Sequence, residues 1–507
     1  MSEVTAQDPL APAEARVSPA QRRLKRLGLV AGPAAALLLY LLPLQALSDD
    51  AHILTAILAW AVLYWIMEPI PLPITSLLGT TFCVLAGLGS AKSIFASYAH
   101  PIVFLFIGSF FLAEAMAVQG VDRRFAAWML SFPWVAASSS RVLLTVGAIT
   151  AAISMWISNT AATAMILPVA LGICTTLGGA SGQSQRHFRT ALMLILSYGA
   201  TAGGMATVIG TPPNLIGVGL LAEQTGVSIS FFTWMAFGLP LAVLILFLCW
   251  GLLRLLHPPG TAVIPYLTSQ FQAQREALGP WTRGQINACL AFGLAVLLWI
   301  GPGLITAFWG SAHPVSVWFD RHLPNELVAL AASGLLFLLP VDTARGQFTL
   351  SWKQAGNINW GIILLFGGGL AFGELMVKTG LSDAVGHGFV NWFGVSTLWS
   401  LTALSIGVAV LVSELASNTA SASMLVPLVI AIAQSADVSA VPPALGACLG
   451  ASLGFALPVS TPPNAIVYGT GHISIHSMVR AGLLFDFIGA TFIWLTLRLL
   501  CPLLGLS

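Results

Sequence analysis

The sequence Ser-Asn-Thr-Ala at 158–161 interrupts an apolar stretch, residues 142–177, that is too long for one membrane crossing. The same four residues return at 417–420, inside a second overlong apolar stretch at 396–435. In both stretches apolar arms flank a tip of small polar residues, and Ser and Asn are suited to cap the helix that begins there. We therefore predict two re-entrant hairpins, each of which enters and leaves the membrane by the same face.

A second shared motif, Thr-Pro-Pro-Asn, follows each hairpin, at 211–214 and at 461–464. Two consecutive prolines remove two backbone donors, and a proline forces the residue before it out of the helical region. We therefore predict broken helices over 190–220 and 443–470. Irregular backbone at membrane depth is tolerated only where it lines a cavity or is buried in protein. Its freed carbonyls can coordinate a cation, while the next helix offers its N–H groups to an anion.

The hydroxyls and amides of the two hairpin tips have the chemistry that such a site needs. Their oxygens suit sodium, and their O–H and N–H groups suit carboxylates. Ser154 and Ser413 stand about one helical turn before the tips and can add ligands. No Lys or Arg lies between residues 142 and 185 or between residues 381 and 479. We therefore expect that an anionic substrate is bound without a cationic side chain, and that bound sodium sets its affinity.

A third shared block indicates that the chain consists of two related halves. Residues 106–122 read FIGSFFLAEAMAVQGVD and residues 366–382 read FGGGLAFGELMVKTGLS, with Glu114 and Glu374 at the same place. Three blocks in the same order predict a repeat of about 250 residues. Each of these glutamates fits a functional intramembrane acid or a helix anchor. Glu414 fits a residue that tunes the cation site or one that braces its hairpin.

The composition places the chain in a membrane. It has 507 residues, of which 57% are hydrophobic and 7% are charged, whereas soluble domains carry about 25% charged residues. The six cysteines are scattered through apolar segments without a Cys-x-x-Cys pair, so neither a zinc site nor a disulfide framework is predicted. The net charge of +2 comes without a basic tract suited to nucleic acid, and we expect no nucleic-acid partner.

The distribution of arginine predicts that the second repeat is inverted. Five arginines lie between residues 121 and 190, namely Arg123, Arg124, Arg141, Arg186 and Arg189. The corresponding stretch of the second half, residues 381–440, contains no Lys or Arg. Because loops rich in Lys and Arg stay in the cytoplasm, equivalent loops of the two halves lie on opposite sides. We predict an all-α polytopic membrane protein of two inverted-topology repeats, with about 11 transmembrane helices plus the two re-entrant hairpins.

The chain then divides into four parts. They are a disordered cytoplasmic N-terminus (1–26), rich in Ala, Pro and polar residues; a first inverted repeat (27–253); a cytoplasmic linker (254–285); and a second inverted repeat (286–507). The apolar run after residue 26 lacks a small-residue cleavage site, so we predict a first membrane span rather than a signal peptide. The protein is expected in the cell inner (plasma) membrane, with its N-terminus in the cytoplasm.

One motif points to a different class of protein, an intramembrane hydrolase. Residues 450–454 match G-x-S-x-G, the nucleophile elbow, but they lie in a small-residue membrane segment without the strand that the motif requires. Tight helix packing explains them better, so we predict no enzymatic activity. A channel, the other alternative, would need a continuous pore, whereas uptake that saturates at low turnover indicates a carrier.

Together these motifs, with Asn359-Trp360-Gly361 leading into LLFGGGLAFG, resemble the divalent-anion/sodium symporter family of the INDY type over residues 30–503. The resemblance implies a homodimer in the membrane lipid, in which a transport part moves like an elevator against a scaffold part. It implies co-transported sodium ions and a small di- or tricarboxylate substrate, such as the C4-dicarboxylates succinate, malate and fumarate. The alternatives within the family are a sulfate transporter and a sodium-independent dicarboxylate exchanger.

The resemblance also implies which residues form the site. The first sodium site would use Ser154, Ser158, Asn159 and Gly210, and the second would use Ser413, Ala416, Asn418 and Ser460. The substrate carboxylates would meet Asn159, Thr160, Thr211, Asn418, Thr419 and Thr461. This chain has Ser413 where family members often have Thr, and Ser460 where they often have Ala. Both changes keep a backbone carbonyl, so sodium binding is still expected and its stoichiometry stays open.

Overall fold

The computed structural model describes residues 19–44, 47–176, 183–258, 267–310, 312–393 and 397–507, and most of these residues are helical. The first half contains α1 (Pro19–Leu41), α2 (Asp49–Met67), α3 (Leu72–Leu85), α4 (Ala91–Ala96), the 3₁₀ helix η2 (Ser97–Ala99), α5 (Pro101–Gln119), α6 (Val121–Leu130), α7 (Pro133–Ala136), α8 (Ser139–Ser154), α9 (Asn159–Thr176), α10 (Gln183–Gly204), α11 (Pro212–Thr225) and α12 (Phe231–Leu256).

The second half follows the helix α13 (Leu267–Ala277). It contains α14 (Arg283–Trp309), α15 (Pro314–His322), α16 (Asn325–Leu338), α17 (Trp352–Ala355), α18 (Trp360–Thr379), α19 (Leu381–Phe393), α20 (Leu398–Leu415), α21 (Asn418–Ser435), α22 (Val441–Ser452), α23 (Pro462–Tyr468) and α24 (Ile475–Leu503). A short antiparallel pair of strands, β1 (Pro340–Asp342) and β2 (Gln347–Phe348), joins α16 to α17.

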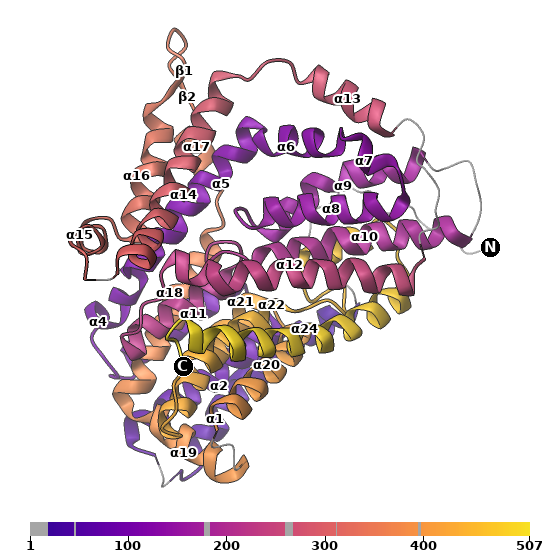
Figure 1. Cartoon of the computed structure of the whole chain (residues 1–507). Coiled ribbons are helices and arrows are strands. Elements are labelled where there is room, and N and C mark those ends of the chain that lie inside the picture. Colours follow the sequence, from indigo (N-terminus) through magenta and orange to yellow (C-terminus); the bar gives the residue numbers. More distant parts are fainter. Residues whose placement is uncertain (1–18, 45–46, 177–182, 259–266, 311, 394–396) are drawn as a thin grey trace.

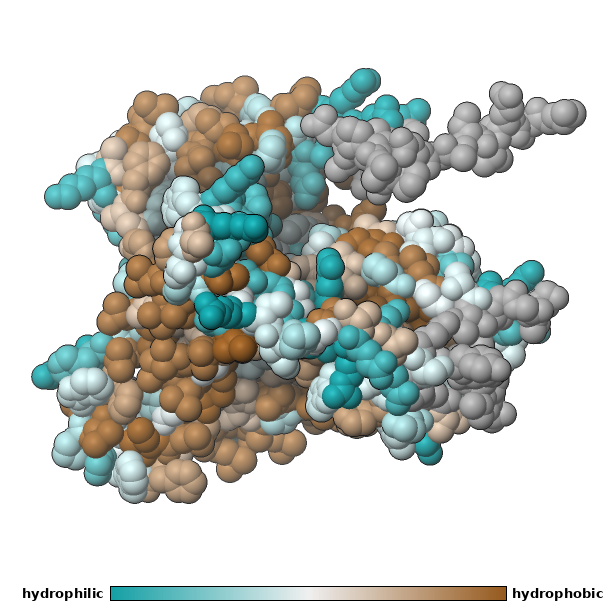
Figure 2. Space-filling view, turned by 90° about the horizontal axis from the view of Figure 1, so that it is seen from above, coloured by the Kyte–Doolittle hydropathy of each residue, from teal (hydrophilic) through white to brown (hydrophobic). Residues whose placement is uncertain are grey.

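The long apolar helices confirm that this is a multi-pass membrane protein. Nine helices of the described residues are long and apolar enough to cross a membrane, α12, α14 and α24 among them. Hydrophobic residues also cover much of the face seen in Figure 2. Two further apolar helices, α3 and α16, have only 14 residues each, fewer than the about 20 that a full crossing needs. The orientation of these helices in the membrane remains a prediction.

Three boundaries differ from those that the sequence predicts. Residues 1–18 of the predicted disordered N-terminus lie outside the described residues, but α1 already begins at Pro19. Gln, Arg, Leu and Lys, which fill residues 21–26, are good helix formers and extend the apolar helix backwards. The predicted linker contains a helix, α13, which packs against α6. Finally, α10 ends at Gly204, several residues before the proline pair that was expected to stop it.

The packing of the helices brings the motifs of the two halves together. Figure 1 shows α8, α10, α12 and α24 side by side across the middle of the molecule, while α5, α14 and α16 pack together at one edge. Each Ser-Asn-Thr motif lies where one helix of a contacting pair is followed by the next, α8 by α9 and α20 by α21, and its asparagine is the first residue of the second helix. In addition, α9 packs against α23 and α21 packs against α11. Each hairpin therefore contacts the broken helix of the other half.

Candidate functional site

The first hairpin tip is built around Ser154 and Asn159. Ser154, the last residue of α8, is completely buried, and its Oγ donates a 2.8 Å hydrogen bond to Oδ1 of Asn159 at the start of α9. The same amide oxygen lies against the end of α10, because a Cβ added to Gly204 would be only 2.4 Å from it. Only a glycine at 204 permits this approach, so the tip is held directly against the first break.

The first break folds back on itself through one asparagine. Asn214, in the first turn of α11, donates through Nδ2 to the carbonyl oxygens of Gly204, at 2.9 Å, and Thr207, at 2.8 Å. These carbonyls have lost their partners in the helix ladder, and a buried backbone oxygen needs a donor. Gly210 also lies against the backbone of Gly204, at a distance that leaves no room for a Cβ. The asparagine of Thr-Pro-Pro-Asn thus explains how the irregular backbone is stabilised inside the protein.

The second tip repeats the arrangement of the first. Ser413 of α20 is completely buried, and its Oγ lies 2.8 Å from Asn418 Oδ1 and 2.6 Å from the carbonyl oxygen of Ala451. Asn418 Nδ2 donates to the carbonyl of Ser452 at 3.4 Å. Gly454 takes the place of Gly204, since a Cβ there would lie 3.4 Å from Asn418 Oδ1 and 3.3 Å from Cβ of Ser460. The second tip is therefore also packed against its own break.

The second break contains the same asparagine clamp. Asn464 Nδ2 donates to the carbonyl oxygens of Gly454, at 2.8 Å, and Leu457, at 3.0 Å. Its Oδ1 accepts a 2.6 Å hydrogen bond from Ser197 of α10. The corresponding oxygen of Asn214 is buried and has no partner among the described residues. Ser197 thus ties the first half to the second break, and no residue that the structure describes does the same for the Asn214 oxygen in the first break.

A carboxylate joins the second tip to the second break. The side chain of Glu414 accepts hydrogen bonds from the backbone N–H groups of Ala456 (2.9 Å) and Leu457 (3.2 Å) and from Ser460 Oγ (2.6 Å). Asp486 of α24 accepts a 3.4 Å bond from the N–H of Phe455 on the same segment. Of the two roles that the sequence left open for Glu414, these contacts favour the brace.

The second tip has more oxygen acceptors than protons. The hydroxyl of Ser413 has a single proton, yet two other oxygens, Asn418 Oδ1 and the Ala451 carbonyl, lie within hydrogen-bonding distance of its Oγ. The hydroxyl can donate to only one of these two oxygens, so the other faces the lone pairs of Ser413 Oγ, which is unfavourable unless a cation lies between them. Neutral oxygens and unwound carbonyls of this kind coordinate sodium in transporters built from broken helices. The chemistry of the second tip fits a sodium ion, and the first tip offers the same serine and asparagine oxygens.

The remaining residues predicted for the site lie around the same two clusters. Ser158 caps α9, because its Oγ accepts from the N–H of Ala161 at 3.2 Å. The equivalent Ser417 makes no such bond, so the predicted capping holds for one tip only. Thr211 and Thr461 begin α11 and α23 and are both buried. The other predicted members lie in the tips or at their edges: Thr160, Ala416 and Thr419.

Two further expectations concern residues away from the tips. Glu374 accepts a hydrogen bond from Ser97, and Glu114 is hydrogen-bonded to Asn357. Glu374 thus joins α18 to η2, and Glu114 joins α5 to the connection between α17 and α18, which favours helix anchoring over a role in binding. Ser452 of the G-x-S-x-G motif is fully buried and donates to the carbonyl of Cys448 in its own helix. This is helix packing, as the sequence predicted.

The sequence missed the residues that hold the breaks together. Asn214 and Asn464 were visible as the last residue of the repeated motif, but nothing in the sequence indicated that they clamp carbonyls. Gly204 and Gly454 stand at matching places before the two prolines, and this was the available signal. The contact of Glu414 with the second break joins residues far apart in the chain, so no local pattern could reveal it.

Comparison with known proteins identifies the family. The sequence profile described as "Sodium:sulfate symporter transmembrane region" matches residues 23–506. A relative from Staphylococcus saprophyticus, named sodium-dependent dicarboxylate transporter SdcS, is 32% identical over 94% of this chain and 91% of its own length. A protein of the same name from Staphylococcus aureus (strain USA300) is 31% identical, with the same coverage of both chains.

Two solved structures share the fold at low sequence identity. The YdaH transporter of Alcanivorax borkumensis has a TM-score of 0.54 and 15% identity, and the match covers 83% of this chain and 88% of that one. MtrF of Neisseria gonorrhoeae has a TM-score of 0.50 and 11% identity, with 82% and 83% of the two chains covered. The chain therefore belongs to the sodium:sulfate (divalent-anion/sodium) symporter family and is a multi-pass membrane transport protein, not an enzyme.

Proposed function

We propose that this protein is a sodium-coupled secondary active symporter that imports a small di- or tricarboxylate. The substrate class is C4-dicarboxylates such as succinate, malate and fumarate. The observation on which this rests is the pair of oxygen clusters in which a buried serine meets a half-buried asparagine, Ser154 with Asn159 and Ser413 with Asn418, each packed against a broken helix. The names of the two staphylococcal relatives support sodium and a dicarboxylate.

The two sodium ions occupy the two tips in this proposal. The first is bound by Ser154, Ser158, Asn159 and Gly210, and the second by Ser413, Ala416, Asn418 and Ser460. Ser460 Oγ lies 3.1 Å from the backbone oxygen of Glu414 and 2.6 Å from its carboxylate. The second cluster therefore contains one more hydroxyl than family members with alanine at that position have. A sodium ion there gains an oxygen ligand.

The substrate is bound by neutral donors. Its carboxylates meet the amides and hydroxyls of Asn159, Thr160, Thr211, Asn418, Thr419 and Thr461, at the N-terminal ends of α9, α11, α21 and α23. Each helix N-terminus contributes roughly half a positive charge, which compensates only part of a dianion in a medium of low dielectric constant. Sodium supplies the rest, so sodium binds first and organises the tips. Coupling of this kind is reciprocal: the substrate tightens sodium binding by the same factor.

The rest of the assembly follows from the family. We propose a homodimer embedded in the lipid of the inner (plasma) membrane, with the N-terminus in the cytoplasm, and transport by an elevator movement. The two inverted repeats provide the matching tips, one reached from each side of the membrane. The contacts of α9 with α23 and of α21 with α11 bring both tips into one body that can move as a unit.

The test is substrate binding at several sodium concentrations in detergent, with choline holding the ionic strength constant. Succinate affinity should rise steeply with sodium, and Asn159→Ala and Asn418→Ala should each abolish transport while expression stays normal. Each variant removes an oxygen ligand and an amide donor from a buried site, at a cost of about 1–3 kcal/mol per unpaired group. A succinate dissociation constant that does not change with sodium would reject the mechanism.

The same measurement separates the two alternatives. The description of the family profile names sulfate, so a sulfate transporter would bind sulfate with sodium and show no response to succinate. A sodium-independent dicarboxylate exchanger would bind succinate equally well in choline. Thermal shift across carboxylates and sulfate, with and without sodium, assigns the protein to one of the three.

A further inference from the structure

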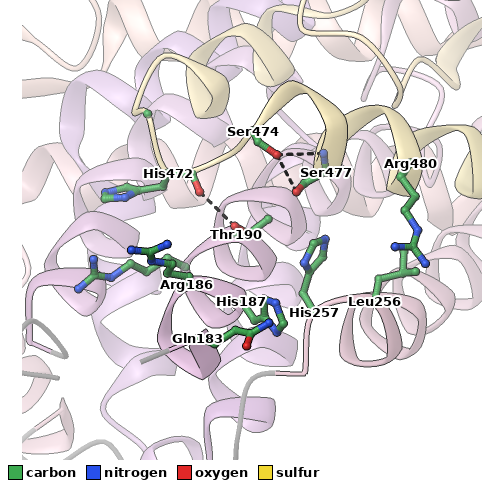
Figure 3. Close-up of a pocket in the computed structure, with 12 residues that line it drawn as sticks. Gln183, Arg186, His187, Thr190, Leu256, His257, His472, Ser474, Ser477 and Arg480 are labelled. Carbon is green, nitrogen blue, oxygen red and sulfur yellow. Dashed lines mark hydrogen bonds between the residues drawn. The ribbon is translucent and has the colours of Figure 1, made fainter. Parts of the chain in front are cut away.

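A basic cavity lies away from both hairpin tips. It has a volume of about 930 Å³ and is formed by the start of α10, the end of α12 and the start of α24 (Figure 3). Thr190 of α10 donates a 3.1 Å hydrogen bond to the carbonyl oxygen of His472, which closes the cavity on the side of the connection between α23 and α24. None of the residues assigned to sodium or substrate lines it.

The lining is cationic, and the described residues that form it include no Asp or Glu. Arg186 and Arg189 come from α10, and Arg480 comes from α24. His187, His257 and His472 complete the basic set. In the view of Figure 3, His187 and His257 lie between Arg186 and Arg480, and the two imidazole rings meet edge to face, with centroids 5.8 Å apart.

The arginines lack counterions. Among the described residues, no Asp or Glu forms an ion pair with Arg186, Arg189 or Arg480. The Nε atom of Arg189 is buried and has no hydrogen-bond partner there. A buried guanidinium nitrogen without an acceptor is costly, whereas the side chains of Arg186 and Arg480 are exposed and lie at the opening of the cavity. An anion in the cavity would give Arg189 Nε an acceptor and would lie among all three guanidinium groups.

The histidines respond to this concentration of positive charge. Burial, His187 and Arg480 lower the pKa of His257 to about 4. Burial and Arg189 lower the pKa of His472. Both rings therefore stay neutral at pH 7, where they can donate one N–H each to a bound anion. An anion between the arginines would remove part of the repulsion and raise both pKa values.

We propose that this cavity binds a phosphate-bearing anion that ties α10, α12 and α24 together. Guanidinium groups bind phosphate in bidentate geometry, and basic pockets between transmembrane helices on the cytoplasmic side bind phospholipid headgroups. The volume, within the range of about 300–1,000 Å³ found for ligand pockets, exceeds what a C4-dicarboxylate needs. The phosphate comes either from an anionic lipid such as cardiolipin or from a soluble polyphosphate.

A phosphate group bound in this cavity would contact helices that are connected to both breaks. Helix α10 leads directly into the first break, and α24 follows α23 of the second break. An anion held between their ends fixes the two breaks relative to each other without touching either tip. This is a role separate from sodium and substrate binding, so its test does not depend on the proposed transport activity.

The experiment is thermal unfolding of the purified full-length protein in detergent. One arm titrates pyrophosphate against sodium chloride of equal ionic strength, and the other adds cardiolipin against phosphatidylcholine. Each is run on the wild type, on the double variant Arg186→Gln/Arg480→Gln and on Arg283→Gln, an exposed arginine outside the cavity. We expect the half-saturating anion concentration to rise at least about tenfold in the double variant, because two charge-assisted contacts are lost, and to stay unchanged in Arg283→Gln.

Each outcome bears on the proposal. Stabilisation by pyrophosphate identifies a soluble ligand, and stabilisation by cardiolipin alone identifies the lipid. Equal stabilisation of all three proteins, or an equal effect of chloride, would overturn the site. Stabilisation by succinate through the same arginines would replace phosphate with a carboxylate and would overturn it too. If the double variant does not fold, Arg480→Lys keeps the charge but loses the bidentate geometry, and unaltered pyrophosphate or cardiolipin binding by that variant would count against the proposal.

Discussion

Replacement of Glu414 by glutamine tests how the second sodium site is held in place. The Glu414 carboxylate accepts three hydrogen bonds, from the N–H groups of Ala456 and Leu457 and from the hydroxyl of Ser460. All three donors belong to the second break, whereas Glu414 itself follows Ser413 at the end of α20. The variant Glu414→Gln has nearly the same shape and therefore perturbs this joint without opening a cavity.

The expected magnitude follows from counting donors. A glutamine side chain has one acceptor oxygen and one NH₂ group. Whichever way the amide is turned, its NH₂ faces one of the two backbone N–H groups, of Ala456 or Leu457, and that N–H loses its partner. A buried donor without a partner costs about 1–3 kcal/mol, which corresponds to a factor of about 5 to 150 in an equilibrium constant.

This cost falls on sodium binding. On the proposed function, the second sodium ion binds only when the tip is packed against the break, since Ser413, Asn418 and Ser460 come from both. The variant destabilises that arrangement specifically. We therefore expect the sodium concentration for half-maximal succinate uptake to rise about 5- to 150-fold in proteoliposomes containing Glu414→Gln, with little change in the maximal rate at saturating sodium.

The matched control is Glu374→Gln. Glu374 is also a glutamate of an apolar helix, but it is exposed and accepts one hydrogen bond from a serine hydroxyl, which can instead accept from the new amide. Its sodium dependence should stay unchanged. A sodium curve for Glu414→Gln that coincides with the wild type, in a protein that folds normally by thermal unfolding, would refute the idea that Glu414 braces the site.

Three further predictions concern other parts of the structure. Ala447 of α22, which packs against α11, stands 250 residues after Ser197, the same offset that separates Asn214 from Asn464. If the repeat places it opposite Asn214, Ala447→Ser should give Asn214 Oδ1 the hydroxyl that Asn464 Oδ1 already has and raise the melting temperature by the roughly 1 kcal/mol of one added hydrogen bond; an unchanged temperature would contradict the equivalence of the breaks. The pKa of His257 is lowered to about 4 from 6.5, so between these pH values the unfolded chain binds more protons than the folded one, and stability falls as the pH falls from 6.5 to 4. The variant His257→Gln should show a smaller fall of the melting temperature over this range, and the same pH dependence in the variant and the wild type would disprove the prediction. Ser184→Cys should react with an impermeant maleimide from the cytoplasm and Asp437→Cys from outside, and reaction of both from one side would exclude inverted repeats.

The helices and the site motifs could be predicted because their causes are local. Hydrophobic length identifies the spans, and the chemistry of proline locates the breaks. The hairpin tips were found because Ser-Asn-Thr is repeated, and the structure places Ser154 against Asn159 and Ser413 against Asn418, one helical turn apart as the spacing indicates.

The points at which the helices stop could not be predicted, because they depend on tertiary contacts. α10 ends at Gly204 and not at the prolines, since the Gly204 carbonyl is taken by Asn214 from the next helix and the glycine allows Asn159 to approach. The basic cavity was equally hidden. Arg189 and Arg480 lie far apart in the sequence, and only the packing of α10, α12 and α24 brings them to one cavity.

The two tips share the serine–asparagine hydrogen bond and the two breaks share the asparagine clamp, but the first tip has no counterpart of the Glu414 carboxylate, and this limits what the loss of Glu414 can do. The first tip has Met155 after its serine, and the backbone oxygen of Met155 accepts a hydrogen bond from Thr207 of the first break. Its sodium site is therefore held by neutral groups alone. Because Glu414 has no counterpart there, Glu414→Gln can weaken one of the two proposed sodium ions and leaves the other unchanged. A sodium titration of the variant should consequently separate into one component at the wild-type concentration and one shifted upwards, whereas a uniform shift of the whole curve would mean that the two tips act as a single site.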